Sequence, residues 1–486
     1  MTSGRFVALA ALALAAGVSL AFSNGQYAHP IASWIAPVLT LRLARMRKPR
    51  WALASTYAVF LAAWIVAWAG VFRLDPVALA PMALILSLLG FLPYLLDRLF
   101  VPRLPALAGS FVLPSANATI ELALSAVSPF GAWGLIGYSQ AEFLPLAQIA
   151  SVTGTLGIGF LIFWFAAVAN LLWEDRRGGR ASAAAFAVPA ALTLSIGGLR
   201  LSDPGAPPRL RTAIVIPPVE DNLNYDEALA PAIQAALFRR TELAARRGAQ
   251  LVVWPEDSFF IRGTEEAALL QRAATMAARL RIHLGIAYGS RVDPAGLRYR
   301  NRFVLLRPNG GTAWRYDKSY PVPGYEAVHM LAGDRRIVRY RSPLGLVSGA
   351  ICFDGDHDPM LRQLGSTSLL LLPSDDWPAI RTLHARMTRL RALEFGVPVV
   401  RPTLNGLSII VDRHGRLLAA RDSRTAGDVA AIAEVPVAGT PTPYARAGSS
   451  IGGLYPTALL LLAGAAALRR RRNRPPAAVS SVVQAG

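Results

Sequence analysis

Three residues that together could transfer an acyl group each follow a short apolar segment. Glu256 comes just after the run 250–254, Lys318 follows the run 312–316, and Cys352 follows the run 344–351. A carboxylate can remove a thiol proton, a thiolate can attack a carbonyl carbon, and an ammonium can stabilise the resulting oxyanion. Strand ends are where α/β folds place their sites, so the pattern predicts nucleophilic acyl chemistry.

Two of these residue types are rare in the chain. Cys352 is the only cysteine among 486 residues, and Lys48 and Lys318 are the only lysines. Each residue alone has a simpler interpretation, because free cysteine is usually a small buried hydrophobe and strand-end Glu and Lys are usually solvated. Their occurrence at three strand ends of one domain favours a shared site.

The composition is that of a protein that lies partly in a membrane. Hydrophobic residues make up 53% of the chain and charged residues only 16%, and the mean hydropathy is +0.38. The net charge of +20 could indicate a nucleic-acid partner, but many basic residues border apolar runs, as membrane topology requires. We therefore expect a membrane and no nucleic acid as partner. A single cysteine excludes an internal disulfide.

Apolar runs of membrane-spanning character lie on both sides of a more polar middle. We expect seven helices in the segment 1–203 and one in the segment 441–486. These are residues 6–22, 31–43, 51–72, 77–96, 107–127, 149–173 and 184–199, then 454–468. Residues 6–22 also have the shape of a signal peptide, but the next apolar run follows at once, which favours an uncleaved helix.

Arginine-rich loops alternate with loops that carry almost no positive charge. The basic loops contain Arg42, Arg45, Arg47, Lys48 and Arg50, then Arg98 and Arg103, then Arg176, Arg177 and Arg180. The positive-inside rule places them in the cytoplasm, so the chain is outside after residue 199. The arginines at 469–472 then anchor the last helix inside. We expect the middle domain to face the periplasm or exterior of a bacterial cytoplasmic (inner) membrane.

Strand and helix patterns alternate between residues 204 and 440. We expect strands at 212–216, 250–254, 283–288, 302–307, 312–316, 344–351, 369–373, 399–403 and 407–411, and helices at 226–247, 265–280 and 380–395. Alternation of this kind predicts a layered α/β sandwich. The fold class expected for the whole chain is a multi-pass α-helical membrane domain plus this sandwich.

Glu256, Lys318 and Cys352, in that order, resemble the Glu-Lys-Cys triad of the nitrilase (carbon-nitrogen hydrolase) superfamily. The flanking membrane helices, with the motifs at 137–140 and 145–148, narrow the resemblance to the apolipoprotein N-acyltransferase family. The loop 318–326 and the segment 384–406 are also similar to that family. The chain departs from the family's pattern at Cys352-Phe353-Asp354, where Cys-Tyr-Glu is usual, at Ser374-Asp375-Asp376-Trp377, and in a short stretch after Glu326.

The resemblance implies a nitrilase-like αββα sandwich and an N-acyltransferase involved in lipoprotein biosynthesis. A fatty acyl chain would pass from a phospholipid, through a thioester on Cys352, to the N-terminal amine of a diacylglyceryl-cysteine lipoprotein, with no cofactor. We expect Glu256 to act as base, and Lys318 with the backbone N–H of Phe353 to hold the oxyanion. Glu326 would support Lys318 or the leaving group, and Asp354 would replace the family's second acid.

Other interpretations of the same residues are a nitrilase-like amidase or hydrolase, an acyltransferase with a different amine acceptor, and a membrane scaffold without activity.

A metal site at 354–358, with His384 and Asp375 as further ligands, is a further alternative. The cluster lacks the glycine and glutamate that a calcium loop needs at its sixth and twelfth positions, and has too few histidines or cysteines for zinc. We therefore expect no metal there, and instead an Asp-rich turn that caps a helix starting near Pro359.

Overall fold

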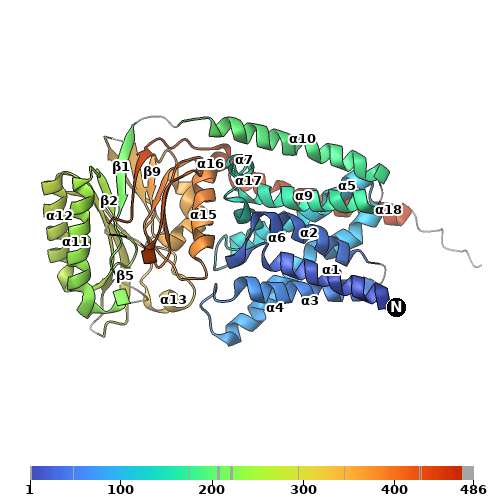
Figure 1. Cartoon of the computed structure of the whole chain (residues 1–486), viewed down its shortest axis with the longest axis horizontal. Helices are drawn as coiled ribbons and strands as arrows, with labels where there is room; N and C mark the ends of the chain where they lie inside the picture. Colours follow the sequence, from blue (N-terminus) through green and yellow to red (C-terminus); the bar gives the residue numbers. More distant parts are fainter. Residues whose placement is uncertain are drawn as a thin grey trace, which may run out of the picture.

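The computed structural model describes residues 3–46, 49–174, 176–204, 208–218, 223–293, 295–343, 345–425, 427 and 429–472. Arg47, Lys48 and the first residue of the strand predicted from 344 lie outside these ranges. Figure 1 shows an elongated molecule with a helical bundle on one side and an α/β sandwich on the other. The chain enters the sandwich after the long helix α10 and returns to the bundle just before α16 (Pro443–Ala447).

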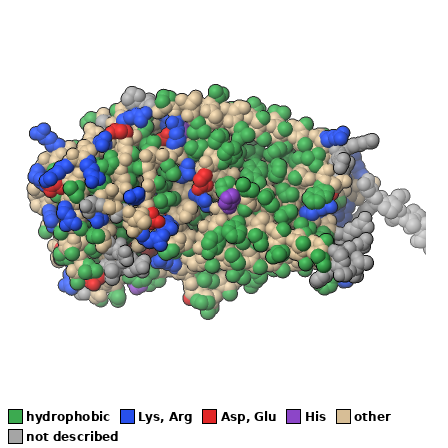
Figure 2. Space-filling view, in the orientation of Figure 1, with side chains coloured by type: hydrophobic (Ala, Val, Ile, Leu, Met, Phe, Trp, Pro, Cys, Tyr) green, Lys and Arg blue, Asp and Glu red, His purple; other side chains and the backbone are tan. Residues whose placement is uncertain are grey.

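The bundle contains all eight predicted apolar helices. They are α1 (Ser3–Ala21), α2 (Pro30–Ala44), α3 (Pro49–Trp68), α4 (Pro76–Phe100), α5 (Ala106–Ser110) with α6 (Val112–Val127), α9 (Thr155–Glu174), α10 (Arg176–Leu201) and α18 (Leu454–Arg472). Within the described residues, six of these helical stretches are long and apolar enough to cross a membrane, and the first two are shorter. Figure 2 shows hydrophobic side chains spread over the bundle, with Lys and Arg gathered over the sandwich and at the far end of the bundle.

The predicted span 149–173 is wrong at its start, because the helix is broken. A short helix, α8 (Ala150–Thr153), ends at Gly154, and α9 begins at Thr155. Gly154 has φ +69°, and a Cβ there would lie 2.5 Å from the ring of Tyr444. The backbone N–H and hydroxyl of Thr155 donate to Glu394 Oε1 at 2.6 and 2.7 Å. A carboxylate from the sandwich therefore caps α9, where the helix dipole favours a negative charge.

The sandwich has two stacked sheets with helices outside them, so the predicted αββα fold is confirmed. The first sheet has the order β15-β1-β2-β4-β5-β6, with β3 beside β4, and the second has the order β14-β13-β11-β9-β8-β7. The first sheet is formed by β1 (Arg209–Ile214), β2 (Leu251–Val253), β3 (Phe260–Arg262), β4 (His283–Arg291), β5 (Tyr299–Leu306), β6 (Thr312–Asp317) and β15 (Ala431–Pro436). The second is formed by β7 (Val338–Ser342), β8 (Gly345–Gly349), β9 (Leu369–Leu371), β11 (Val399–Arg401), β13 (Leu407–Val411) and β14 (Leu417–Asp422).

The helices of the sandwich set its orientation toward the bundle. Helices α11 (Ala230–Arg246) and α12 (Glu266–Leu280) cover the outer face of the first sheet, and α15 (Arg381–Phe395) lies between the second sheet and the bundle (Figure 1). Leu383, Met387 and Leu390 of α15 belong to the apolar core of the bundle. A contiguous core of aliphatic and aromatic side chains fills the space between the two sheets. The sandwich is thus fixed to the bundle through one face of α15.

Several predicted boundaries differ from the observed ones for local reasons. The strand predicted at 344–351 ends at Gly349, and Cys352 begins the 3₁₀ helix Cys352–Asp356. The strand predicted at 399–403 is interrupted at Pro402, which lacks a backbone N–H, and Thr403–Leu404 (β12) instead pairs with Ser374–Asp375 (β10). The helix predicted from 226 begins at Ala230, one residue before a proline that suits a first helical turn.

Candidate active site

The structure brings the three predicted catalytic residues together at the ends of β2, β6 and β8. Glu256, Lys318 and Cys352 are each at most 3% exposed. Lys318 Nζ lies 2.8 Å from Glu256 Oε1, which also accepts from Asn301 Nδ2 at 2.7 Å. The N–H of Asp375 donates to Glu256 Oε2 at 2.7 Å, and the carbonyl of Asp375 lies 3.8 Å from Cys352 Sγ. The backbone of Asp375 thus contacts both the carboxylate of Glu256 and the thiol of Cys352.

Lys318 is held between two carboxylates. Glu326, on α13 (Tyr325–His329), contacts Lys318 Nζ through Oε1 at 2.8 Å and accepts from Val322 N through Oε2 at 2.8 Å. Burial lowers the pKa of Lys318, but the carboxylates of Glu256 and Glu326 outweigh this effect and raise it well above its usual value. The ammonium is therefore permanently charged at neutral pH, as stabilisation of an oxyanion requires.

Cys352 occupies an unusual backbone conformation at the start of its 3₁₀ helix. Its φ of +46° is in the left-handed region that L-residues with a side chain rarely adopt. The N–H of Cys352 donates to Pro373 O at 2.8 Å, which fixes this turn beside β10. Burial, together with the negative charge of Glu256, raises the pKa of the thiol well above its usual value, and the positive charge of Lys318 opposes this shift. The resting thiol is thus protonated and needs a base.

Asp354 connects the segment that carries Cys352 to the segment that carries Lys318. Its carboxylate accepts hydrogen bonds from the N–H groups of Ser319 and Tyr320 at 3.0 and 2.8 Å and from the hydroxyl of Tyr316 at 2.6 Å. It also accepts from Ile351 N at 3.1 Å. Burial raises the pKa of Asp354 to about 6 despite these bonds. Through these bonds Asp354 holds the segment of Cys352 and the segment of Lys318 next to each other.

A buried charge network that sequence reasoning missed lies behind Cys352. His384 Nδ1 lies 2.8 Å from Asp376 Oδ1, and His384 Nε2 lies 3.0 Å from Asp356 Oδ2. Arg401 Nη2 is 2.7 Å from Asp376 Oδ1. Burial lowers the pKa of His384, but the two carboxylates raise it to about 9 overall. No local sequence signal identified this network, because its members lie on different elements that are far apart in the chain.

The prediction that the Asp-rich turn caps the following helix is wrong. Helix α14 (Asp358–Leu361) has His357 at its N-cap, with no side-chain hydrogen bond to the helix. Asp354 instead contacts the Lys318 segment, and Asp356 Oδ2 accepts from the indole of Trp133 at 2.8 Å. These carboxylates therefore serve tertiary contacts rather than a local helix end.

Two groups of side chains in the described residues have possible metal-ligand atoms within 4.8 Å of one another. One consists of Cys352, Asp376 and His384, and the other of Glu256, Asp257 and Glu326. In the first group Arg401 and His384 already contact Asp376, and in the second Lys318 already contacts Glu256 and Glu326, though not Asp257. The donor set therefore fits internal ion pairing better than a metal ion.

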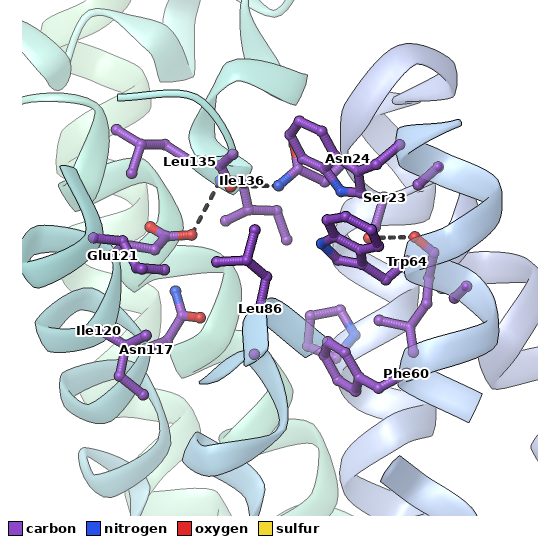
Figure 3. Close-up of a pocket in the computed structure, with 18 of the residues that line it drawn as sticks. Ser23, Asn24, Phe60, Trp64, Leu86, Asn117, Ile120, Glu121, Leu135 and Ile136 are labelled. Atoms are coloured by element: carbon purple, nitrogen blue, oxygen red, sulfur yellow. Dashed lines mark hydrogen bonds between the residues drawn. The ribbon is translucent and has the colours of Figure 1, made fainter. Parts of the chain in front are cut away.

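Two cavities lie near the site, and packed aromatic side chains connect their linings. One, of about 160 Å³, lies inside the helical bundle among mostly apolar side chains that include Phe60, Trp64 and Leu86 (Figure 3). The other, of about 350 Å³, lies beside Glu326 and is lined by Arg73, Tyr225, Asp257, Val322, Pro323, Tyr325, Asp375, Asp376 and Trp377. We call them the bundle cavity and the polar cavity.

The linings of the two cavities are connected by packed aromatic rings. Trp133 lines the bundle cavity and Trp377 the polar cavity, and their ring centroids are 5.9 Å apart. The ring of Phe353, next to Cys352, packs edge-on against Trp133 at 5.7 Å. Phe72 and Arg73 are consecutive residues that line the bundle cavity and the polar cavity respectively. The linings of the apolar and the polar cavity therefore contact each other through Trp133 and Trp377, and Trp133 also contacts the neighbour of Cys352.

Comparison with known proteins agrees with this architecture. Residues 15–168 match the model of the apolipoprotein N-acyltransferase N-terminal domain, and residues 214–441 match that of carbon-nitrogen hydrolase. An apolipoprotein N-acyltransferase of Geobacter metallireducens is 28% identical over 59% of this chain and 60% of its own length. One of Bradyrhizobium diazoefficiens is 28% identical over 65% of this chain and 66% of its own. The structure of an amidase from Nesterenkonia sp. matches 53% of this chain and 99% of its own, with 18% identity and a TM-score of 0.39.

The C-terminal match places the sandwich among carbon-nitrogen hydrolases, the class to which its buried Glu, Lys and Cys also point. With the matching N-terminal domain in front of it, the chain belongs to the apolipoprotein N-acyltransferase family of the nitrilase superfamily. The aligned region spans less than two thirds of the length of these two relatives.

Proposed function

We infer that this chain is a membrane-bound N-acyltransferase that acylates the N-terminal amine of a lipoprotein. The observation that carries the proposal is the placement of the only thiol beside a buried Glu256–Lys318 pair, 2.8 Å apart, in a domain packed on a bundle of apolar helices. Soluble amides need no access to lipid, so the bundle favours a lipid substrate over a small amide.

The mechanism has two halves that share one base. Glu256 removes the proton of Cys352, and the thiolate attacks the carbonyl carbon of a phospholipid ester. Lys318 and the N–H of Phe353 stabilise the tetrahedral oxyanion. The lysophospholipid oxygen leaves with the proton held by Glu256, and a thioester remains. An amine then attacks the thioester, Glu256 takes a proton from its nitrogen, and Cys352 regains its own.

The bundle cavity supports a phospholipid as acyl donor. Its lining is mostly apolar, and it reaches Trp133, whose ring contacts Phe353 next to the nucleophile. Burial of methylene groups against such a lining is favourable at about 0.8 kcal/mol per CH₂. A lipid tail bound there would bring its ester toward Cys352 from the membrane side.

Intact-mass measurement of the acyl-enzyme tests the proposal. Protein purified from membranes and given phospholipid without an amine should gain one fatty acyl mass that hydroxylamine removes. Cys352→Ser should lose adduct and turnover, because a hydroxyl is far less acidic than a thiol and is poorly matched to this base. Glu256→Gln should also form no adduct. Glu434→Gln, at a half-exposed carboxylate on β15, is the matched control.

The acceptor distinguishes the transferase from its rivals. A diacylated lipopeptide with a free N-terminal amine should discharge the thioester faster than water does. If the thioester instead clears rapidly in buffer and lipopeptide neither speeds its loss nor becomes acylated, the chain is a lipid-facing hydrolase. If wild-type protein turns over without any adduct on Cys352, the thioester mechanism is wrong. Absence of both adduct and turnover would identify a scaffold.

A further inference from the structure

The polar cavity is lined by two acidic side chains that have no basic partner within ion-pair distance among the described residues. Of the carboxylates that line it, Glu326 pairs with Lys318 at 2.8 Å, and Asp376 pairs with Arg401 at 2.7 Å. Asp257 and Asp375 differ, because their side-chain partners are the neutral amides of Asn301, at 3.1 Å, and Asn405, at 2.9 Å. Among the described residues neither has a basic side chain within ion-pair distance.

Asp257 is the more buried of these two side chains and has a carboxylate oxygen without a partner in the described residues. It is 1% exposed, and within the described part of the chain its Oδ1 has no hydrogen-bond partner. Its φ of +43° is a strained conformation for a residue other than glycine. A buried carboxylate oxygen without a partner is costly, and strain of this kind is typical of ligand sites. Burial and the neighbouring acids raise the pKa of Asp257 well above its usual value.

Aromatic rings complete the lining. Tyr225 stacks on Phe260 with centroids 4.6 Å apart and meets Tyr325 edge-on at 6.3 Å. Trp377 also lines the cavity, and the guanidinium of Arg73 lies 4.8 Å from its ring centroid. Carboxylates combined with aromatic faces are a suitable environment for an organic cation. A divalent metal fits less well, because Lys318 already occupies the oxygens of Glu256 and Glu326 that would complete its shell.

We propose that the polar cavity is the docking site of the amine acceptor, which enters as a primary ammonium bound by Asp257 and Asp375. This inference rests on the proposed function, since it assigns the second substrate of the same thioester. The acyl donor approaches from the bundle cavity and the acceptor from the polar cavity, whose linings contact each other through Trp133 and Trp377. Both Asp257 and Asp375 are then specificity-determining residues for the acceptor.

In the proposed reaction the acceptor nitrogen loses two protons and exchanges them for a bond to the acyl carbon. The ammonium nitrogen loses one proton and attacks the thioester carbon, so that a C–N bond forms and the C–S bond breaks. As the amide forms, the nitrogen loses a second proton. One of the two protons returns to the sulfur of Cys352, and the other leaves through Glu256 to solvent. Asp375 is suited to guide the nitrogen, because its own N–H contacts Glu256 and its carbonyl contacts the thiol.

The test is single-turnover discharge of the acyl-enzyme. The acceptors are a diacylated lipopeptide with a free N-terminal amine, and hydroxylamine, a nucleophile that is uncharged at neutral pH. In Asp257→Asn and Asp375→Asn, the half-saturating concentration of lipopeptide should rise about tenfold or more, since a charge-assisted hydrogen bond is lost. Discharge by hydroxylamine should fall by much less. Glu434→Gln should match wild type with both nucleophiles.

A wild-type measurement covers the case in which the variants do not fold. Trimethylammonium, which forms no stable amide, should inhibit discharge by lipopeptide competitively, compared with sodium chloride at equal ionic strength. The docking site would be overturned if trimethylammonium did not inhibit. It would also be overturned if the variants lost discharge by lipopeptide and by hydroxylamine equally, or if their half-saturating concentration of lipopeptide did not change. If wild-type protein forms no acyl-enzyme at all, the proposed function itself fails, which is a different result.

Discussion

The indole Nε1 of Trp133 donates a hydrogen bond of 2.8 Å to Asp356 Oδ2 and so connects the helical bundle to the 3₁₀ helix that begins with Cys352. The same loop makes a second contact, from Ala132 N to Asp356 O at 3.2 Å. A Cβ on Gly131 would lie 2.7 Å from that carbonyl, so only glycine allows this approach. The membrane domain therefore helps to set the position of the nucleophile.

Replacement of Trp133 tests this connection. Trp133→Phe keeps an aromatic ring at this position but removes the donor to Asp356, a hydrogen bond to a charged group worth about 1.5–3 kcal/mol. We expect a lower midpoint of thermal unfolding in detergent and slower acylation of Cys352. Trp51→Phe, at a lipid-facing position 61% exposed, should change neither. An unaltered acylation rate in Trp133→Phe would show that the bundle does not position the thiol.

Lys318→Arg should lose most activity although the charge is kept. The ammonium lies in a buried space between Glu256 and Glu326, both 2.8 Å away, and a planar guanidinium is too bulky for that space. Loss of an oxyanion donor costs about 10²–10³-fold in rate, so single-turnover acylation should fall by about that factor. The reverse exchange Arg300→Lys, at a partly exposed pair with Asp317, is the control. Near-normal turnover in Lys318→Arg would remove this residue from the mechanism.

Stability should depend on pH through His384. Its pKa in the folded protein is about 9, above the usual value of 6.5, because Asp356 and Asp376 stabilise the charged ring. Because the pKa is higher in the folded than in the unfolded protein, protonated His384 contributes about 3 kcal/mol to the free energy of unfolding. This contribution is complete below pH 6.5 and is lost as the pH rises to about 9. Chemical unfolding measured from pH 6 to 10 should show this loss in wild type. His384→Gln should flatten the curve, His329→Gln should not, and a wild-type curve that is flat over this range would contradict the assignment.

Reporter fusions test the orientation in the membrane. A fusion after Leu199 should report the outside, and one after Arg472 the cytoplasm, because the arginine-rich loops are retained inside. Fusions after Arg45 and Arg98 serve as cytoplasmic controls. An outside signal at the C-terminal position would show that the number of crossings is not the predicted one.

The candidate catalytic residues and the two kinds of domain could be predicted from the sequence, because each depends on a short, contiguous pattern of residues. Hydropathy over about twenty residues identifies apolar helices, and alternation of strands and helices identifies the sandwich. Glu256, Lys318 and Cys352 stand out because each follows a strand and two are rare residue types. Their positions at strand ends of one domain also predicted that they lie together, whereas the distances between them depend on how the two sheets stack.

What the sequence by itself determined is therefore the membrane-embedded part, the αββα class and the candidate nucleophile, base and lysine. Tertiary structure decided the break at Gly154, which depends on a carboxylate of Glu394 far along the chain, and the left-handed turn at Cys352. It also decided which carboxylates acquire cationic partners: Asp376 has Arg401, whereas Asp257 has only an amide. Local sequence cannot determine such pairings, because burial and charge compensation depend on which side chains long-range packing brings together.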